Sequence, residues 1–551
     1  MSTSATPSAA PDRMTHREVL VVFSGLMAGM LLAALDQTIV ATALPTIVGD
    51  LGGLDHLAWV VTAYLLTSTA ATPLFGKISD LYGRKRIFQA AIGIFLVGSV
   101  LSGMSQTMGQ LIAFRAVQGI GGGGLMALSQ AIIGDIVSPR ERGRYQGYIG
   151  SVFALSSVAG PLLGGFFVDQ LDWRWVFYVN VPVGAVALFM TTRALRLPAR
   201  RVEHRVDYLG SALMVAAVTS LLLALIWGGQ QYPWGSPIVV GLLVGGLALT
   251  GLFIAHERRT PEPVLPLRLF SSRIFTLSSM AAFVVGAGMF GAIVFLPLFL
   301  QVVTGASATN SGLLLLPLML GLLVASVGSG RLISRTGRYK HFPVAGTATM
   351  AVGLYLLSTM DVTTTRATTA VFMVVLGLGI GMVMQVLVLA VQNDVAYADL
   401  GVATSAASFF RSLGGSVGAA AFGAIMSSRL DHWLERLGPS VAQAGIDPAT
   451  LQGSPAAIAA LPPEVRQVVA EAFARSISTV FLVAVPFAIV ALVLVLLLEE
   501  KPLRDTVHVA GGGAAEDLTL TLEEFEPDHL HAPPPAPTTE PAHPTGDPAA
   551  G

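Results

Sequence analysis

The sequence contains no cysteine, and only 12% of its residues are charged. The absence of cysteine excludes disulfide bonds and thiol chemistry anywhere in the chain. Soluble domains carry about 25% charged residues, so the polar surface that a water-soluble fold needs is missing here. Together with a mean hydropathy of +0.70, this composition predicts a membrane protein and excludes an ordinary soluble enzyme.

The sequence also lacks an excess of charge of either sign, because it has 32 basic and 33 acidic residues. Proteins that bind nucleic acid usually carry a clear excess of positive charge, so no nucleic-acid partner is expected. The sequence has no catalytic nucleophile motif, cofactor fingerprint or set of metal ligands, and we therefore expect no cofactor and no metal site. Only four of the basic residues are lysine, a bias typical of GC-rich bacterial genomes.

What the chain does have is fourteen apolar windows of about 18–25 residues, each long enough to cross a hydrocarbon core of about 30 Å as a helix. The first window is too long to be the core of a signal peptide. These windows predict an all-α polytopic membrane protein. They lie near residues 19–43, 57–76, 87–104, 109–134, 146–169, 175–193, 208–228, 237–255, 274–301, 310–331, 342–359, 368–391, 402–427 and 477–498.

The distribution of basic residues predicts the orientation of these spans. If the N-terminus is cytoplasmic, 24 of the 32 Lys and Arg residues lie in cytoplasmic segments and six lie outside. The positive-inside rule then places both termini in the cytoplasm, and the membrane is expected to be the bacterial cytoplasmic membrane. The remaining two basic residues, Arg115 and Arg411, lie inside predicted spans.

An internal repeat divides the chain into two halves. Gly76, Gly83, Arg84 and Arg86, which follow the second span, recur as Gly330, Gly337, Arg338 and Lys340 after the tenth span, at a constant offset of 254 residues. Duplicated halves around a central site are usual in secondary transporters. The predicted parts are a cytoplasmic tail (1–18), a six-helix half (19–193), two inserted helices with flanking loops (194–273), a second six-helix half (274–498) with an extracytoplasmic loop (428–476), and a disordered cytoplasmic tail (499–551).

Five segments between about residues 19 and 500 resemble motifs of the major facilitator superfamily, and in particular of its fourteen-helix drug:proton antiporter branch. The resemblance implies the major facilitator fold and a proton-coupled multidrug exporter that works by alternating access. Its partners would be protons, small amphipathic substrates that are lipophilic or cationic, and the lipid bilayer, with the proton gradient as driving force and a monomer as the expected state. The segments are Leu35–Pro45, Gly76–Arg86, Leu111–Gly119, Gly160–Gly165 and Trp173–Pro182.

Asp36 is the only carboxylate well inside a predicted span. An acid near the bilayer centre costs about 2.5–3.5 kcal/mol on insertion scales, so it usually faces the interior of a helix bundle. Arg115 is predicted at a similar depth in the fourth span, and proton binding to Asp36 would weaken an ion pair between them. We therefore predict that Asp36 and Arg115 couple proton binding to helix position; the alternative is a permanent structural ion pair.

Two further groups of residues are predicted to serve conformational change. The resemblance implies that the loop after the second span latches the two halves together, although a basic loop could also simply mark the cytoplasmic side. The second copy of this loop has Ser334 in place of Asp80, which predicts an asymmetric latch. The predicted latch residues are Gly76, Asp80, Gly83, Arg84 and Arg86, and the residues predicted to allow close helix packing are Gly160, Pro161, Gly164 and Gly165.

A substrate cavity is expected between the halves. Arg411 could pair there with a substrate anion, a backbone carbonyl or Gln385, whereas a single Asp36 favours cationic or neutral substrates. The repeat equivalents of Asp36 and Arg115 carry no charge, so the proton machinery is predicted in the first half only. The candidate cavity residues are Gln37, Tyr64, Gln118, Phe153, Phe290, Gln385, Phe409 and Arg411. The alternative functions are export of one specific lipid or secondary metabolite, and ligand sensing without transport.

Overall fold

A computed structural model of the chain describes residues 16–51, 57–137, 139–194, 207–229, 231–396, 399–437, 458 and 461–504. These residues belong to one compact unit, Met1–Ala510, and a second unit, Gly511–Gly551, lies outside the described residues. The C-terminal tail beyond residue 504, whose disorder is predicted, and residues 438–457, 459 and 460 of the predicted loop 428–476 therefore also lie outside them. Residues of that loop up to Leu437 and from Pro463 onward belong to helices.

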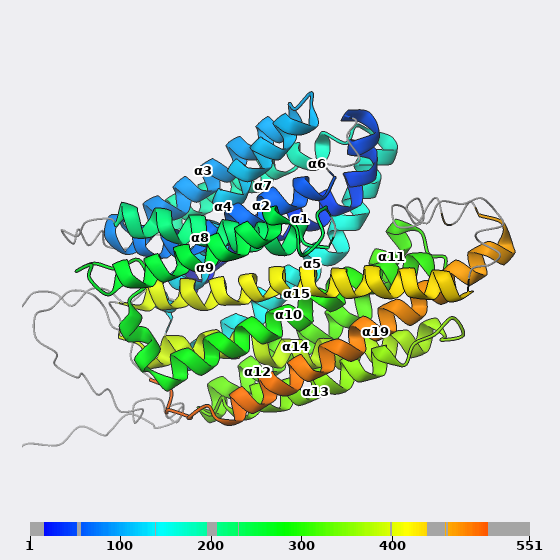
Figure 1. Cartoon of the computed structure of the whole chain (residues 1–551). Helices are drawn as coiled ribbons and strands as arrows, with labels where there is room; N and C mark the ends of the chain where they lie inside the picture. Colours follow the sequence, from blue (N-terminus) through cyan, green and yellow to red (C-terminus); the bar gives the residue numbers. More distant parts are fainter. Residues whose placement is uncertain are drawn as a thin grey trace, which may run out of the picture. The chain divides into compact units, whose positions relative to one another are not determined.

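Apart from one isolated β-bridge between Gly228 and Tyr232, the described regular structure is helical. This agrees with the all-α prediction (Figure 1). The helices are α1 (His16–Leu51), α2 (Leu57–Tyr82), α3 (Arg84–Gly103), α4 (Met108–Ile136), α5 (Pro139–Gln170), α6 (Trp175–Tyr178), α7 (Asn180–Ala194), α8 (Tyr208–Trp227), α9 (Pro237–Glu257), the 3-10 helix η2 (Leu267–Ser271), α10 (Arg273–Val302), α11 (Ala308–Leu314), α12 (Leu316–Thr336), α13 (His341–Ser358), α14 (Arg366–Asp394), α15 (Leu400–Leu437) and α19 (Pro463–Leu496).

Hydroxyl side chains fix the start of several helices. Thr107 accepts a hydrogen bond from the backbone N–H of Gln110, and Ser272 accepts one from Phe275, so each caps the first turn of its helix. Within the helices the backbone satisfies its own hydrogen bonds, which a chain in hydrocarbon requires. The helix starts are thus set by local side chains, while several helices, such as α15 and α19, extend well beyond the apolar windows predicted for them.

Twelve described segments are long and apolar enough to cross a membrane. The predicted count of fourteen exceeds this number. Each of the fourteen predicted windows lies on a described helix, but α2 and α13 do not meet the criterion of length and composition. Both helices pack against other helices, α2 against α4 and α13 against α14 and α19. A helix that is covered by its neighbours can carry more hydroxyl groups than one that faces lipid.

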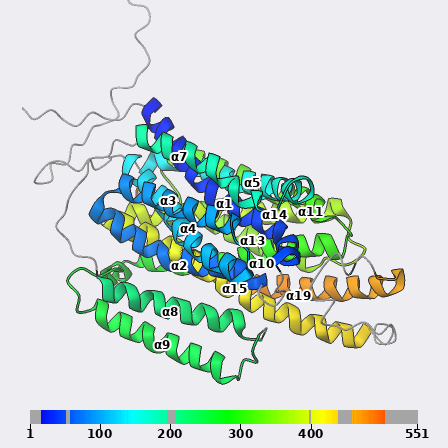
Figure 2. The same ribbon diagram turned by 90° about the horizontal axis from the view of Figure 1, so that it is seen from above.

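The helices form two sets that contact one another. In the first set α1 packs against α5 and α7, and α4 packs against α2 and α3. In the second set α10 packs against α15 and α19, and α14 packs against α12 and α13. Contacts of α5 with α12 and of α2 with α15 join the sets. Helices α8 and α9, from the predicted inserted region, pack mainly against each other at the side of the bundle (Figure 2).

Glycines allow α4 to approach two neighbouring helices closely. A Cβ atom on Gly121 would lie 2.5 Å from the backbone nitrogen of Phe95 in α3, and one on Gly123 would lie 2.9 Å from the carbonyl carbon of Ser68 in α2. Both distances are shorter than a carbon atom tolerates, so these crossings need glycine.

We expect Gly123→Ala to lower the thermal stability of the purified protein in detergent, because its methyl group would push α4 away from α2. Gly93→Ala is the matched control, since Gly93 is also helical and nothing lies within 4 Å of its Cβ position. Alanine is favoured over glycine in a helix by about 1 kcal/mol, so the control should melt at the same temperature as the wild type or higher. Equal melting temperatures for the two variants would contradict the packing argument.

Candidate functional site

Asp36 of α1 and Arg115 of α4 form a buried ion pair. The Nη1 atom of Arg115 lies 2.6 Å from the Oδ2 atom of Asp36, and the side chains are 2% and 0% exposed. A pair so completely removed from water is held strongly, because the low dielectric of its surroundings strengthens the attraction. Loss of either partner would leave a buried charge without compensation.

Neutral side chains complete the hydrogen bonds of this pair. Gln118 donates to Oδ1 of Asp36 at 2.8 Å, and Asn180 of α7 donates to the same oxygen at 3.0 Å. Arg115 in turn donates from Nη1 to Oε1 of Gln118 at 2.8 Å and from Nε to the carbonyl of Val60 at 3.3 Å. Helices α1, α2, α4 and α7 therefore all meet at one carboxylate and one guanidinium.

Aromatic rings cover the guanidinium of Arg115. Its Cζ atom lies 4.3 Å from the ring centroid of Tyr64 and 5.9 Å from that of Phe177. Such cation–π contacts stabilise the charge most when water is excluded, as it is here. Tyr64 and Gln118, predicted as cavity residues, thus belong to the surroundings of the ion pair.

The crossing of α1 and α5 lies next to Asp36. Thr38 donates to the carbonyl of Ser156 at 2.9 Å, and the Cβ position of Gly160 would meet the side chain of Thr38. One turn further, the Cβ position of Gly164 lies 3.0 Å from the carbonyl oxygen of Ile39. The glycines predicted to allow close packing do so within two or three residues of the ion pair.

Pro161 extends this contact to α11 of the other set, because a Cβ atom on Gly312 would lie 2.8 Å from Cβ of Pro161. Gly165 is half-buried in α5. A movement of α1 at Asp36 would therefore displace α5. Helix α5 also packs against α12 of the second set.

A second charged cluster joins the end of α2 to the start of α3. Arg84 contacts Asp80 (Nη2 to Oδ1, 2.7 Å) and Asp135 at the end of α4 (Nε to Oδ2, 2.8 Å). The Cβ position of Gly401, at the start of α15, lies 2.6 Å from Nη2 of Arg84, so α15 packs directly on this cluster. The predicted loop thus contacts the second set of helices.

The remaining loop residues have different surroundings. Gly76 packs against α15, since a Cβ atom there would lie 2.7 Å from Cβ of Ser405. Gly83 has a φ of +94°, a conformation that favours glycine, with nothing within 4 Å of its Cβ position. Arg86 is exposed. Glycine is therefore needed at Gly76 for space and at Gly83 for backbone conformation.

A buried contact between the two sets was not predicted. Arg142 of α5 donates to the carbonyls of Val137 and Gly134 and, at 3.3 Å, to Oε1 of Gln392 in α14. Gln392 donates from Nε2 to the carbonyl of Gln130 in α4 at 3.2 Å. In the sequence Arg142 appears only as one of several basic loop residues, so nothing distinguishes it without the fold.

The second copy of the repeated loop is held by the segment that follows α19. Glu500 accepts hydrogen bonds from the backbone N–H groups of Tyr339 and Lys340, at 2.8 and 3.2 Å. Ser334, which stands where the first copy has Asp80, bonds to the carbonyl of Gly330 in its own helix. The two loop copies are therefore stabilised in different ways.

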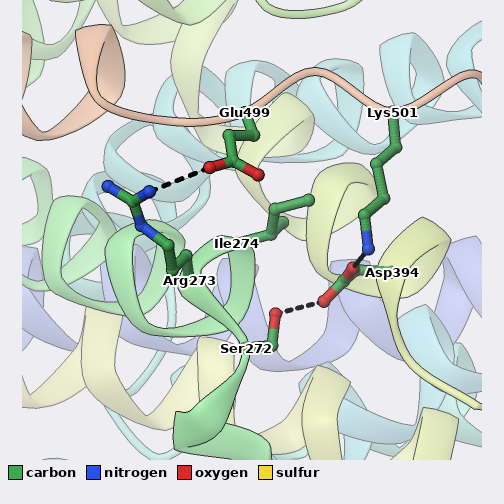
Figure 3. A pocket seen from close by; sticks show the side chains of 6 residues that line it. All are labelled: Ser272, Arg273, Ile274, Asp394, Glu499 and Lys501. Carbon is green, nitrogen blue, oxygen red and sulfur yellow. Dashed lines mark hydrogen bonds and ion pairs between the residues drawn. The ribbon is translucent and has the colours of Figure 1, made fainter.

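Figure 3 shows the pocket beside this segment, where Arg273 pairs with Glu499 at 3.0 Å and Lys501 pairs with Asp394. Ser272 also donates to Asp394. These contacts tie residues 499–501 to the ends of α10 and α14.

The other candidate cavity residues lie apart from the ion pair or at the edge of its cluster. Gln37 and Phe153 are half-buried, whereas Phe409 is buried in a core cluster that includes Met214 of α8 and Phe275 of α10. Gln385 is buried in α14, and Arg411 lies in α15. The side chain of Phe290 lies outside the described residues.

Asn180, Ser99 and Asp135 are site residues that were missed. Asn180 falls within the Trp173–Pro182 segment that resembles a family motif, so a signal for it existed. Ser99 accepts from Asn180 at 3.0 Å and orients it. Ser99 and Asp135 carry no signal of their own, because only the packing of α3, α4 and α7 brings them to these clusters.

The described residues thus form a bundle of helices long enough to cross a membrane, with a sealed ion pair in one set of helices and arginine contacts between the two sets, an arrangement suited to a membrane transporter. A sequence profile described as Major Facilitator Superfamily matches residues 26–419. The chain therefore belongs to the major facilitator superfamily, and it is a transporter of small substrates, not an enzyme.

Relatives and solved structures agree with this assignment. The chain is 47% identical to the uncharacterized MFS-type transporter Rv1877 of Mycobacterium tuberculosis, over 88% of this chain and 70% of the relative. It is 42% identical to the multidrug transporter protein MdtP of Bacillus subtilis, over 80% of this chain and 82% of the relative. The structure of the proton:xylose symporter XylE matches with a TM-score of 0.57 at 13% identity, covering 86% of this chain and 96% of the other, which shows a shared fold.

The ion pair predicts a non-additive effect of substitutions. Arg115→Gln leaves the carboxylate of Asp36 buried without its counter-charge, which should lower the free energy of unfolding by about 3–5 kcal/mol. The double variant Asp36→Asn/Arg115→Gln removes both charges and should be more stable than Arg115→Gln alone. Unfolding in detergent is measured for four proteins: wild type, Asp36→Asn, Arg115→Gln and the double variant. Losses that simply add would show that the two side chains do not interact.

Asp80 gives a pH dependence of definite sign. It follows the predicted span 57–76, and burial raises its pKa from 3.8 to about 6, against the opposing effect of Arg84 and Lys77 and with further raising by Asp135 and Asp399. The folded chain thus holds this proton more tightly than the unfolded chain. The contribution of Asp80 to stability is therefore greatest below pH 3.8 and falls as the pH rises to about 6.

Wild-type protein should accordingly lose more thermal stability between about pH 4 and pH 6 than the Asp80→Asn variant does. Asp361→Asn is the control, because hydrogen bonds from Thr363 and Thr364 lower the pKa of that exposed carboxylate and keep its titration below this range. Melting temperatures measured across the range test this. Parallel curves for wild type and Asp80→Asn would contradict the assignment.

Proposed function

We propose that the protein is a proton-coupled exporter of lipophilic, amphipathic compounds that works by alternating access as a monomer in a bacterial cytoplasmic membrane. The observation that carries this proposal is the sealed Asp36–Arg115 pair, whose hydrogen bonds join α1, α2, α4 and α7. An ionisable group at this depth is expensive, and proton transfer is a common use of it in transporters. The relatedness to a multidrug transporter supports an outward direction of transport.

The mechanism follows from the contacts of Asp36. A proton that reaches Asp36 from outside removes its negative charge, so the attraction to Arg115 is lost. Gln118 can then bond to Arg115 alone, and α1 is released from α4. Thr38 is hydrogen-bonded to α5, and α5 packs against α12. The movement of α1 would therefore be transmitted to the second half. Outward release of the compound and return to the inward state would follow, with loss of the proton inside.

Charged contacts at one end of the bundle support a state closed toward the cytoplasm. Arg84 with Gly401, and Arg142 with Gln392, join the two halves where most basic residues gather. The positive-inside rule makes this the cytoplasmic end and puts both termini there. These contacts would have to open for a compound to enter from the cytoplasm.

We further propose that α2 and α13 cross the membrane, which makes fourteen crossings. The end of α1 lies near Trp173, which donates to Asp50 at 2.8 Å, whereas α3 begins at Arg84 beside Asp135 at the opposite end. Helix α2 connects these two ends and, with 26 residues, is about 39 Å long. Helix α13 likewise runs from Tyr339 beside Glu500 to the far start of α14.

Transport by Asp36→Asn tests the mechanism. In inverted vesicles with an acidic interior, wild type should accumulate a xanthene dye, either fluorescein or rhodamine 6G, in response to the pH gradient. The variant cannot release or bind a proton at this position, so its gradient-driven uptake should fall by about tenfold or more, as expected for the loss of an energetic coupling. Asp361→Asn, which changes an exposed carboxylate, should leave uptake unchanged. Undiminished gradient-driven uptake by Asp36→Asn would refute proton coupling at this site.

A further inference from the structure

Eight buried side-chain polar atoms in the second half lack hydrogen-bond partners among the described residues, and only two of the eight belong to a charged or amide side chain. These two are the Nη1 atom of Arg411 in α15 and the Oε1 atom of Gln385 in α14. A guanidinium inside a membrane bundle is costly, and such groups normally pair with a carboxylate or a backbone carbonyl. An unsatisfied donor of this kind calls for an explanation.

A hydrogen bond between α14 and α15 shows where these two side chains lie. Gln392 donates from Nε2 to the hydroxyl of Thr404 at 3.1 Å, which fixes the register of these antiparallel neighbours. Gln385 precedes Gln392 by seven residues, and Arg411 follows Thr404 by seven residues. Seven residues are about two helical turns, so Gln385 and Arg411 lie at one depth, on the same faces as the bonded pair.

These faces lie at the boundary between the two halves. Gln392 also donates to the carbonyl of Gln130 in α4 and accepts from Arg142 of α5. Two turns along α14 and α15 from these contacts, away from the basic end of the bundle, the same helix faces carry Gln385 and Arg411, which places both residues toward the first half. A compound that passes between the halves would meet this position directly above the closed contacts.

The carboxylates that could neutralise Arg411 are engaged elsewhere. Asp394 and Asp399 lie at the ends of α14 and α15, where they pair with Lys501 and Arg268. Asp36 is fully occupied by Arg115, Gln118 and Asn180. The Asp36–Arg115 pair of the first half thus has no net charge. Among the described residues of the membrane helices, Arg411 is left as a positive charge without a counter-ion.

We infer that Arg411 binds an anionic group of the transported compound and that Gln385 accepts a hydrogen bond from a hydroxyl or N–H group beside it. This inference rests on the proposed function and narrows its substrate class to amphipathic organic anions, such as aryl carboxylates. It replaces the cationic or neutral substrates that a single Asp36 favours from sequence, because Arg115 neutralises the buried negative charge of Asp36. A carboxylate would give Arg411 the charge-assisted hydrogen bond that it lacks.

Equilibrium binding of two related dyes tests this inference. Fluorescein and rhodamine 6G share a xanthene ring system, but ionised fluorescein is an anion and rhodamine 6G is a cation. Fluorescence polarisation with the purified full chain in detergent should show tighter binding of fluorescein. Arg411→Gln should weaken fluorescein binding by about tenfold or more, as for loss of a charge-assisted hydrogen bond, and change rhodamine 6G binding less than about twofold. Gln385→Leu should weaken fluorescein binding by about threefold, because its neutral acceptor is worth less.

Two further variants control for folding and for bulk charge. Arg411→Lys keeps the positive charge and should bind fluorescein better than Arg411→Gln does. Arg366→Gln removes an exposed arginine at the start of α14 and should leave both affinities unchanged. Tighter binding of rhodamine 6G by wild type, or an equal loss of both dyes in Arg411→Gln while Arg411→Lys also fails, would overturn the inference.

The two proposals can fail separately. Binding in detergent needs no proton gradient, so anion selectivity that depends on Arg411 would stand even if Asp36→Asn transported normally. Gradient-driven uptake of rhodamine 6G alone, lost in Asp36→Asn, would instead support proton coupling and refute the anionic substrate class.

Discussion

The arrangement of the first half depends on one constraint, that a carboxylate removed from water must be fully bonded. Asp36 meets this requirement with Arg115, Gln118 and Asn180, and Arg115 in turn bonds to the carbonyl of Val60. Four helices are thereby held at one point. Water does not reach this carboxylate, so solvent cannot compensate a change in its charge. The helices that bond to it would have to move instead. The glycine-lined crossing of α1 and α5 lies directly beside Asp36. The close contact at this crossing would let a movement of α1 displace α5.

The two halves use charge in different ways. The first half contains a neutral pair and an acid–base cluster, in which Arg84 bridges Asp80 and Asp135. The second half has no described equivalent of either within its membrane helices, and its repeated loop is held by Glu500 in the segment after α19. Under the proposed mechanism this asymmetry would separate two tasks: the first half would bind the proton, and the second half would present a positive charge to the transported compound.

Much of the helical architecture could be predicted from sequence, because hydrophobic length and charge placement act locally. Each predicted window lies on a described helix, and family membership followed from short motifs. The count of crossings was less secure, because α2 and α13 are not among the twelve segments that are long and apolar enough to cross a membrane, and the neighbours that cover them are visible only in the fold. Depth alone suggested that Asp36 and Arg115 meet, whereas Ser99, Asp135 and Arg142 gave no comparable signal.

The sequence by itself determined that the chain is a helical membrane protein, because its apolar segments are long enough to span a bilayer and its charged residues are too few to cover a water-soluble surface. Its resemblance to a transporter family came from short motifs. The sequence also placed one acid and two arginines inside the membrane. Only the tertiary structure decided which of these charges is satisfied. Packing of α1, α4 and α7 encloses Asp36 and Arg115 together, while the register of α14 and α15 leaves Arg411 opposite Gln385. Pairing depends on contacts between residues far apart in the chain, and these contacts set the sign of the charge that remains for a substrate.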